Sequence, residues 1–192
     1  MRQSTQEFAI ARPLVTWDGA TPARSERRLV RAAQRGSEQA IEDLVRLHWP
    51  AAHQAAFLIT RDAAAAEDIA QESILGAIDS LHRFDRRRRF RPWLHRIVAN
   101  RSIDWVRARD RRREVELDGA AAVSLRDDSA AAALEILATL DPRTRAIVVL
   151  RCLLDYRPRE IAAMVDLSSG AVRTRLHRGL AELRRAIEGD EG

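Results

Sequence analysis

The sequence contains no lysine, a single cysteine, few aromatic residues and no long hydrophobic run, and each shortage excludes a class of protein. Cys152 has no partner for an internal disulfide and cannot build a cysteine-based zinc site. No apolar stretch approaches the roughly 20 residues that a transmembrane helix needs. The first thirty residues lack the apolar core of a signal peptide. We therefore expect a cytoplasmic protein with no membrane insertion, no metal and no cofactor.

Glycine and proline are also scarce, eight and six in 192 residues, which leaves long stretches free to form helices. Apolar residues recur with helical spacing over 29–109 and again over 131–187. Ser37, Asp62 and Asp141, the last followed by proline, are typical helix starts. Strand-type alternation and internal repeats are absent from the sequence. The patterns predict an all-α protein with two small helical domains joined by a flexible linker.

The expected domain limits follow from where the helical period starts and stops. The first segment has no such period, and the segment after Arg112 is rich in carboxylates without an apolar stripe. We expect a disordered tail over 1–26, a first domain over 27–112, an acidic linker over 113–130, a second domain over 131–187 and a short tail over 188–192.

Charge is distributed unevenly along the chain. The net charge is +5, but residues 82–113 hold thirteen arginines against three aspartates. Residues 37–81 hold eight acids against two arginines. Every basic residue is arginine, whose guanidinium group binds phosphate and guanine through two parallel hydrogen bonds. This separation indicates two partners of opposite charge preference rather than non-specific binding to nucleic acid.

Residues 159–178 have the spacing of a helix-turn-helix. Their apolar set is Ile161, Ala162, Val165, Leu167, Val172 and Leu176. Ser168 is placed to cap the second helix, and polar and basic side chains share one side of it near its start. These candidate DNA contacts are Ser169, Arg173, Thr174, His177 and Arg178. The alternatives are a plain helical hairpin with a solvated face and a one-component DNA-binding regulator.

A second stripe lies on the helix expected after Asp62, away from its apolar seam. It consists of Asp68, Gln71, Glu72, Leu75 and Asp79, at helical spacing. An outward leucine flanked by carboxylates suits a protein interface with an apolar centre and an acidic rim. The alternative is an acidic face that is merely solvated.

The arginine-rich segment before and within the third helix of the first domain suits single-stranded nucleic acid. Arg96, Asn100 and Arg107 share a helix face, and an asparagine amide can read a base edge. Trp93 fits the core better than base stacking. Arg101 fits either a salt bridge with Asp104 or a DNA contact. The candidate contacts are Phe84, Arg86, Arg87, Arg88, Arg89, Arg91, Arg96, Asn100, Arg101 and Arg107.

With these motifs in order, residues 29–187 resemble the σ factors of the extracytoplasmic-function (ECF) group, which keep the second and fourth conserved regions of larger σ factors. The run from Asp62 to Ser73 looks like the family's polymerase-binding helix. The run from Phe84 to Trp105 looks like its promoter-melting and −10-reading segment. The run from Leu140 to Arg178 looks like its −35-reading domain.

The resemblance implies a transcription initiation factor rather than an enzyme, and the five scattered histidines offer no catalytic site. It implies that the acidic stripe binds the clamp coiled coil of the β′ subunit of core RNA polymerase, and that the chain also meets the β flap. Promoter DNA would be bound as single strand at the −10 element, with one base flipped out, and as duplex at the −35 element. An anti-σ factor, common in the family, would cover the acidic stripe or the basic −35 face.

The chain departs from the family pattern at three places. Arg86 to Arg89 stand where small polar residues are usual, which affects the expected base pocket. Arg157 replaces a hydroxyl cap, so we expect Asp155 to cap that helix instead. Asp166 stands where the turn usually has glycine, and we expect it to adopt the left-handed conformation. A σ-like protein that binds polymerase without melting promoters stays a further alternative.

Overall fold

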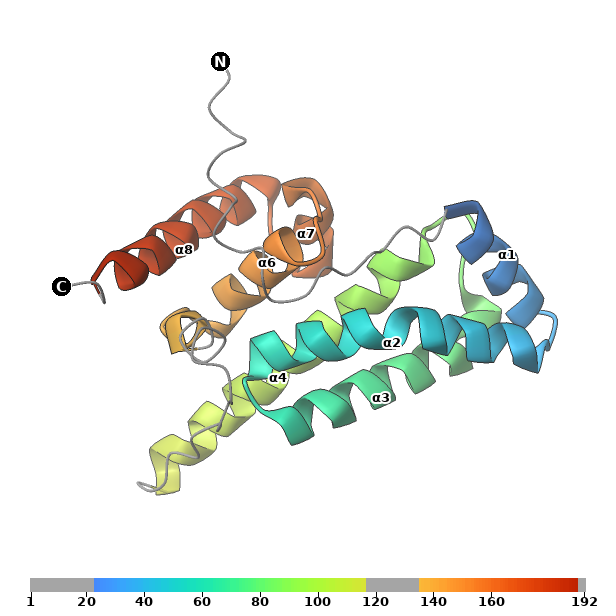
Figure 1. Ribbon diagram of the computed structural model, residues 1–192, viewed down its shortest axis with the longest axis horizontal. Coiled ribbons are helices and arrows are strands. Elements are labelled where there is room, and N and C mark those ends of the chain that lie inside the picture. The colour runs from blue at the N-terminus through green and yellow to red at the C-terminus, as the bar shows by residue number, and fades with distance from the viewer. Residues whose placement is uncertain (1–22, 117–134, 190–192) are drawn as a thin grey trace, which may run out of the picture.

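The computed structural model describes residues 23–116 and 135–189, and all regular secondary structure within them is helical. The helices form an N-terminal group, α1 to α4, and a C-terminal group that ends with α8 (Figure 1). The C-terminal helices lie on the side of α2 and α4 that faces away from α3 (Figure 1). The expectation of two small all-α domains is confirmed.

The N-terminal domain is a bundle built around small side chains. Its elements are α1 (Ala23–Ala33), α2 (Glu38–Thr60), α3 (Ala63–Asp79), a 3-10 turn (Leu81–Arg83) and α4 (Phe90–Glu116). Ala52 and Ala56 of α2 and Ala66 and Ala70 of α3 are fully buried. Alanine at such positions lets helix axes approach closely, which explains how a chain with few aromatic residues fills its core.

Side-chain caps fix where these helices begin. Ser37 Oγ accepts from the Ala40 N–H at 3.3 Å, and Asp62 Oδ1 accepts from the Ala65 N–H at 2.9 Å. Both caps were expected from the sequence. Arg61 ends α2 in the left-handed region, with φ of 58°, so the chain reverses into α3 within two residues. Pro50 lies inside α2 without ending it.

The C-terminal domain consists of a helical segment over 135–138, α6 (Pro142–Cys152), α7 (Pro158–Met164) and α8 (Ser169–Gly189). Asp141 Oδ1 accepts from the N–H groups of Arg143 and Thr144, both at 3.1 Å, as the Asp-Pro motif predicts. Gly179 lets α8 meet α6, because a Cβ atom there would lie 2.8 Å from Thr144 Cγ2.

Helix limits correct the sequence expectations at two boundaries. α1 begins at Ala23, inside the segment expected to be a disordered tail, and α4 continues to Glu116, inside the expected linker. The arginine and glutamate residues before Glu116 have high helix propensity, which favours extension of α4 over a loop. The rest of the tail, the linker from 117 and residues 190–192 lie outside the described residues.

The cap of α7 also differs from expectation. Asp155 has a φ of 53° and pairs with Arg151 at 2.5 Å, so it does not cap the helix. The Glu160 carboxylate accepts from the Arg157 N–H at 2.9 Å instead, which satisfies one of the groups at the helix start. Asp166 adopts the left-handed conformation, with φ of 54°, as expected.

Candidate polymerase and nucleic-acid interfaces

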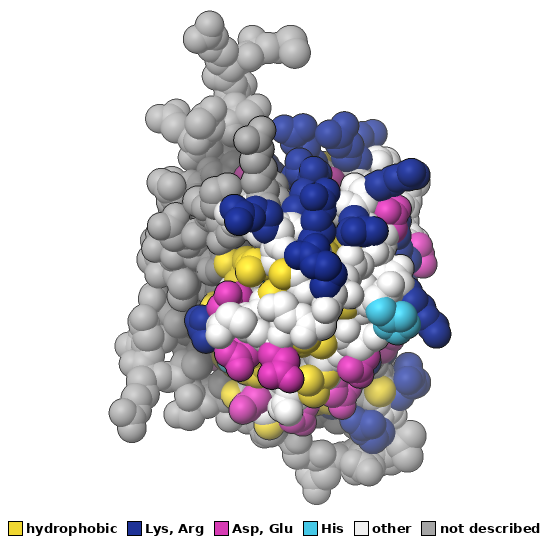
Figure 2. Space-filling view, turned by 90° about the vertical axis from the view of Figure 1, so that its right-hand side faces the viewer, with side chains coloured by type: hydrophobic (Ala, Val, Ile, Leu, Met, Phe, Trp, Pro, Cys, Tyr) yellow, Lys and Arg dark blue, Asp and Glu magenta, His cyan; other side chains and the backbone are white. Residues whose placement is uncertain are grey.

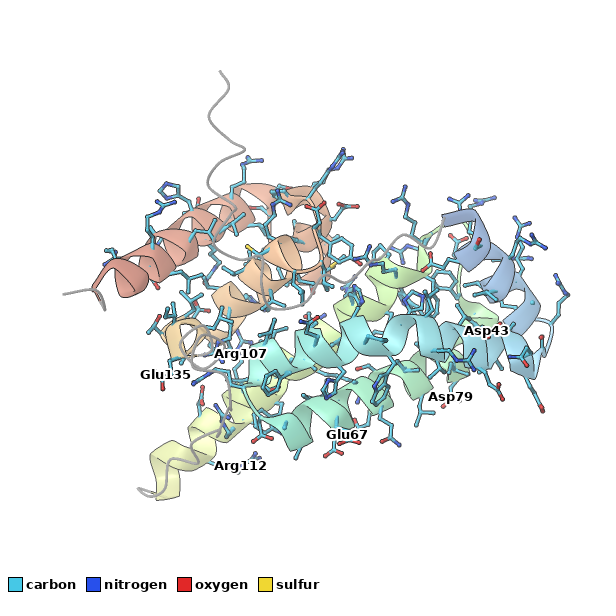
Figure 3. The ribbon with its side chains drawn as sticks, in the orientation of Figure 1. Asp43, Glu67, Asp79, Arg107, Arg112 and Glu135 are labelled. Carbon is cyan, nitrogen blue, oxygen red and sulfur yellow. The ribbon has the colours of Figure 1, made fainter. Side chains whose placement is uncertain are left out.

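The outer face of α3 carries the predicted acidic stripe, and all of it is exposed. Its members are Asp68, Gln71, Glu72, Leu75 and Asp79. Leu75 is 53% exposed, and among the residues that the structure describes it is the one large hydrophobic side chain that is exposed. The opposite face, including Ile69 and Ile74, is buried in the bundle. Figure 3 shows Glu67 and Asp79 at the outer edge of α3. An apolar centre with an acidic rim is therefore available to a partner.

Arg101 connects this stripe to α4. Its Nη1 contacts Oε2 of Glu72 on the neighbouring helix, so the alternative pairing with Asp104 is not adopted. Both side chains are substantially exposed, and such pairs contribute little to stability. The pair instead places a member of the acidic stripe beside a candidate DNA contact.

The arginine loop, Arg86 to Arg89, lies exposed between the 3-10 turn and α4. An aromatic cluster holds its two ends, because the Phe84 ring lies 5.7 Å from that of Phe90 and 4.8 Å from that of Trp93. Phe84 is only 8% exposed, so its ring braces the loop from inside. A contact of Phe84 with DNA is not accessible in this conformation and stays a prediction. Trp93 packs against the core, as expected.

Three of the predicted −10 contacts on α4 face the C-terminal domain. Asn100 Nδ2 donates to the Met164 carbonyl at 3.0 Å. Arg96 Nη2 lies 3.6 Å from Asp166 Oδ1, and Arg91 Nη2 donates to the Leu154 carbonyl at 3.2 Å. We use the term domain contact for the contacts between the two domains, which include these three and those of His95 and Arg145 described below. Arg107, further along α4, is exposed.

A buried histidine–tyrosine pair belongs to the same domain contact and was not found from the sequence. His95 Nδ1 and the Tyr156 hydroxyl share a hydrogen bond of 2.8 Å. Burial, with a smaller effect from Arg91, holds the pKa of His95 well below its usual range. Burial also raises the pKa of Tyr156. The pair is therefore neutral at physiological pH.

Arg145 joins the domains through backbone carbonyls and was also missed. Its guanidinium group donates to the carbonyl of Ile59 at 2.8 Å, at the end of α2. It also donates to the carbonyls of Leu137, Ala138 and Leu140 at 2.8, 3.2 and 3.0 Å. Helix ends leave such carbonyls without partners, and they favour a cation. Burial, and then the nearby Arg61 and Arg109, lower the pKa of Arg145 to about 10, so it stays charged at neutral pH.

The predicted reading face of α8 is free in the described structure. Arg173, Thr174, His177 and Arg178 are exposed, and Ser169 is half-buried. Ser168 Oγ accepts from the Ala171 N–H at 3.1 Å, as predicted for a cap. Arg175 points to the other side, where it pairs with Asp141 at 3.3 Å. Val172 is buried against the preceding helices, which fixes the orientation of the reading face.

In residues 23–116 and 135–189 no group of three potential metal ligands comes together. Over the same residues, every helix is too short or too polar to cross a bilayer.

Comparison with known proteins matches both halves of the chain. The family model for Sigma-70 region 2 matches residues 44–112, and that for Sigma-70 region 4 matches residues 130–183. The RNA polymerase sigma factor CarQ of Myxococcus xanthus is 34% identical over 167 residues, covering 79% of this chain and 91% of CarQ.

A probable RNA polymerase sigma factor, RfaY of Xanthomonas campestris, is 35% identical over 148 residues, covering 69% of this chain but only 36% of RfaY. The solved structure of CnrH, an RNA polymerase sigma factor of Cupriavidus metallidurans, in complex with the cytosolic domain of CnrY is also similar. It has a TM-score of 0.69 at 30% identity and covers 86% of this chain and 99% of the other.

Proposed function

The chain belongs to the extracytoplasmic-function σ factors of the σ70 family, and from this membership we propose which surface meets each partner. It is an RNA polymerase σ factor that directs promoter recognition. We propose that the outer face of α3 docks on core polymerase, that the arginine loop and α4 hold the melted −10 strand, and that α8 reads the −35 duplex.

Support for polymerase docking on α3 comes from Leu75. A leucine that is 53% exposed gains from burial, and about 25 cal/mol per Å² of apolar area favours an interface that covers it. The carboxylates around it then select a basic partner surface and speed the encounter. On this proposal that surface is the clamp coiled coil of β′.

The docking proposal is tested by capture of core RNA polymerase under matched salt. The variant Asp68→Arg, Glu72→Arg should lose capture, because two rim charges are reversed. The matched control Glu38→Arg, Glu42→Arg makes the same change of charge on exposed positions of α2 and should retain capture. If the α3 variant binds as well as wild type, docking through this face is wrong.

The −10 proposal requires the domain contact to open. Asn100 donates to the Met164 carbonyl and Arg96 lies beside Asp166, so both side chains contact the C-terminal domain. The amide of Asn100 cannot reach a base edge while this contact holds. We propose that docking on polymerase separates the two domains and frees this face of α4. The exposed arginine loop then holds the strand electrostatically while a base is extracted, which costs a few kcal/mol.

The −35 proposal rests on the free reading face of α8. A helix whose first three turns present arginine, threonine and histidine can donate and accept along base edges in the major groove. We expect Arg173→Ala to relax the base preference at one position, at about 1–3 kcal/mol, as lost bidentate contacts do elsewhere.

Function as a whole is tested by transcription with purified core polymerase from templates randomised at both promoter elements. Defined −35 and −10 sequences should emerge among the transcribed templates, and Asn100→Ala should weaken selection at the −10 element alone. Binding to duplex DNA without polymerase, and no transcription, would favour a one-component regulator. Polymerase binding without transcription would favour a σ-like protein that does not melt promoters.

No catalytic step is assigned to this chain, because promoter opening can be driven by binding free energy alone. The work of an ECF σ factor is done with RNA polymerase, which places its action in the cytoplasm. CnrH has been solved in complex with a domain of another protein, CnrY. By analogy we propose that a regulatory protein binds this chain, as an anti-σ factor would, on the acidic stripe or on the −35 face.

A further inference from the structure

A basic pocket of about 370 Å³ opens between α1 and the segment that follows α3. It is separate from Asn100 and from the reading face of α8. Its lining residues are Arg31, Gln34, Arg35, His82, Arg83, Phe84 and Arg86. Figure 2 looks onto the end of the molecule that carries α1 and shows arginine side chains gathered over its upper part, with acidic side chains below.

The pocket is held in shape by a glutamine that ties its two walls together. Gln34 Nε2, on the turn that ends α1, donates to the carbonyl of Leu81 at 2.8 Å and to that of Phe84 at 3.0 Å. Leu81 and Phe84 are themselves buried. The spacing between α1 and the 3-10 turn is therefore fixed by long-range contacts and is ready before any ligand arrives.

The charge of the pocket is not balanced from within. Arg31, Arg35, Arg83 and Arg86 are exposed, and within the described part of the chain no carboxylate pairs with them. Glu26, the nearest acid on α1, accepts from the Arg91 N–H at 3.2 Å and lies 3.1 Å from His48 Nε2. Four like charges around one hollow repel each other, and a bound anion removes that cost.

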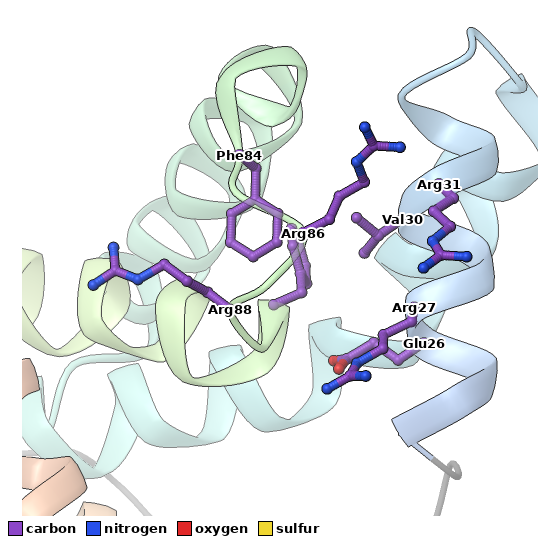
Figure 4. Close-up of a pocket in the computed structure, with 8 residues that line it drawn as sticks. Glu26, Arg27, Val30, Arg31, Phe84, Arg86 and Arg88 are labelled. Atoms are coloured by element: carbon purple, nitrogen blue, oxygen red, sulfur yellow. The ribbon is translucent and has the colours of Figure 1, made fainter.

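The chemistry of the walls identifies the anion. Guanidinium groups match the oxygens of phosphate through paired hydrogen bonds, whereas sites for apolar small molecules have predominantly apolar linings. The pocket is also continuous with the arginine loop, because Arg86 and Arg31 line both it and an adjoining smaller hollow. Figure 4 shows Arg86 reaching from the loop toward α1, while Arg88 extends away from it.

We propose that this pocket binds backbone phosphate of single-stranded DNA, so that the strand held by the arginine loop continues across α1. The inference rests on the proposed −10 function and extends it to Arg31, Arg35 and Arg83, which the sequence motifs did not include. Because the walls contact phosphate only, the pocket adds affinity without base preference.

The test measures binding of the full chain to a 20-nucleotide single strand of random sequence, by fluorescence anisotropy over a range of salt concentrations. Each phosphate contact contributes about 0.7 to the slope of log K against log salt. The variant Arg31→Gln, Arg35→Gln should therefore lower the slope by about 1.4 and weaken binding at least about tenfold at 0.1 M salt. Both side chains are exposed and repel the other arginines of the pocket, so the melting temperature should not fall.

The matched control is Arg111→Gln, Arg112→Gln, which removes the same charge from exposed positions at the far end of α4 (Figure 3). It should leave most of the salt slope intact. An equal loss of slope in both variants would overturn the proposal that the pocket binds phosphate. A fully methylphosphonate strand, which carries no backbone charge, should bind wild type and pocket variant alike.

Pyrophosphate and nucleoside triphosphate are titrated in parallel as alternative sources of phosphate. Tight binding of either that depends on Arg31 and Arg35, with strand binding unchanged in the variant, would overturn the proposal in favour of a free-nucleotide site. Capture of core polymerase by the pocket variant is measured alongside. Retained capture with an unchanged salt slope refutes the pocket alone, whereas failed capture by wild type refutes the proposed function.

Discussion

The two helices proposed to read promoter DNA are presented in opposite ways. On α8, Arg173 and Arg178 are exposed, whereas on α4 the side chains of Arg96 and Asn100 contact the other domain. The duplex-reading surface is thus ready in the free chain, and part of the strand-reading surface is covered. A σ factor built in this way meets single-stranded DNA with its full surface only after its domains separate.

The covering contact combines apolar packing, since buried side chains of both domains form one core cluster, with a polar part that can be exchanged. The polar part includes hydrogen bonds to the carbonyls of Met164, Leu154 and Ile59 and one exposed ion pair. A hydrogen bond of this kind contributes only about 0.5–1.5 kcal/mol net, since water or a new partner can replace it. Binding of polymerase and DNA can therefore offset its loss.

Arg145→Met should have the largest effect, because it should expose the covered surface of α4. The substitution leaves two buried carbonyls, of Ile59 and Leu140, and two partly buried ones without their charged donor, at a cost of about 3 kcal/mol. It also removes the link to the end of α2, so the domains should separate and the radius of gyration in X-ray scattering should rise. Urea unfolding gives the stability. The exposed Arg159→Met is the control, and an equally small cost for both would contradict the role of Arg145.

Gly179→Ala should damage the duplex-reading domain and spare the other. The added Cβ would lie 2.8 Å from Thr144 Cγ2 and 3.2 Å from Val148 Cγ2, and such overpacking costs about 1–3 kcal/mol. Gly170→Ala on the same helix meets nothing closer than 3.8 Å and should be neutral or stabilising. Thermal unfolding measures both, and capture of polymerase through α3 should survive in both. Equal melting temperatures would show that α8 can shift away from α6.

The helices, their caps and the exposed surfaces could be predicted from the sequence, but the contact between the two domains could not. Helical period, the caps at Ser37, Asp62 and Asp141, and the outward Leu75 are local features with a fixed spacing, and local spacing is visible in a sequence. The domain contact joins His95 to Tyr156, 61 positions apart, and Ile59 to Arg145, 86 positions apart. In a chain with so many arginines, nothing local distinguishes the buried Arg145 from those in solvent.

Acid should loosen the domain contact without changing α8. The pKa of His95 is depressed while it is buried beside Tyr156 and returns toward about 6.5 when the domains separate. Above that pH both states are neutral and the contact keeps its full strength. Below it the separated state takes up a proton that the buried ring does not, so the contact should weaken progressively as the pH falls.

Scattering between pH 8 and pH 5.5 measures this opening. His95→Gln does not titrate at this position, so its radius of gyration should depend much less on pH. A wild-type radius that is constant over the range would show that His95 is not released when the chain acidifies.

Asp166→Asn should have the smallest effect, because it touches only the ion pair with Arg96. The two groups lie 3.6 Å apart with side chains 43% and 85% exposed, and a pair in such surroundings is worth well under about 1 kcal/mol. Asparagine tolerates the left-handed backbone of this turn, so the helix-turn-helix should keep its geometry. Single-strand affinity should rise less than about twofold, while duplex binding stays unchanged. Asp166→Ala strains the turn as well, and should therefore weaken duplex binding. If Asp166→Asn and Asp166→Ala weaken duplex binding equally, α8 is positioned by the carboxylate rather than by the turn conformation. The reading surfaces of α4 and α8 would then not be independent.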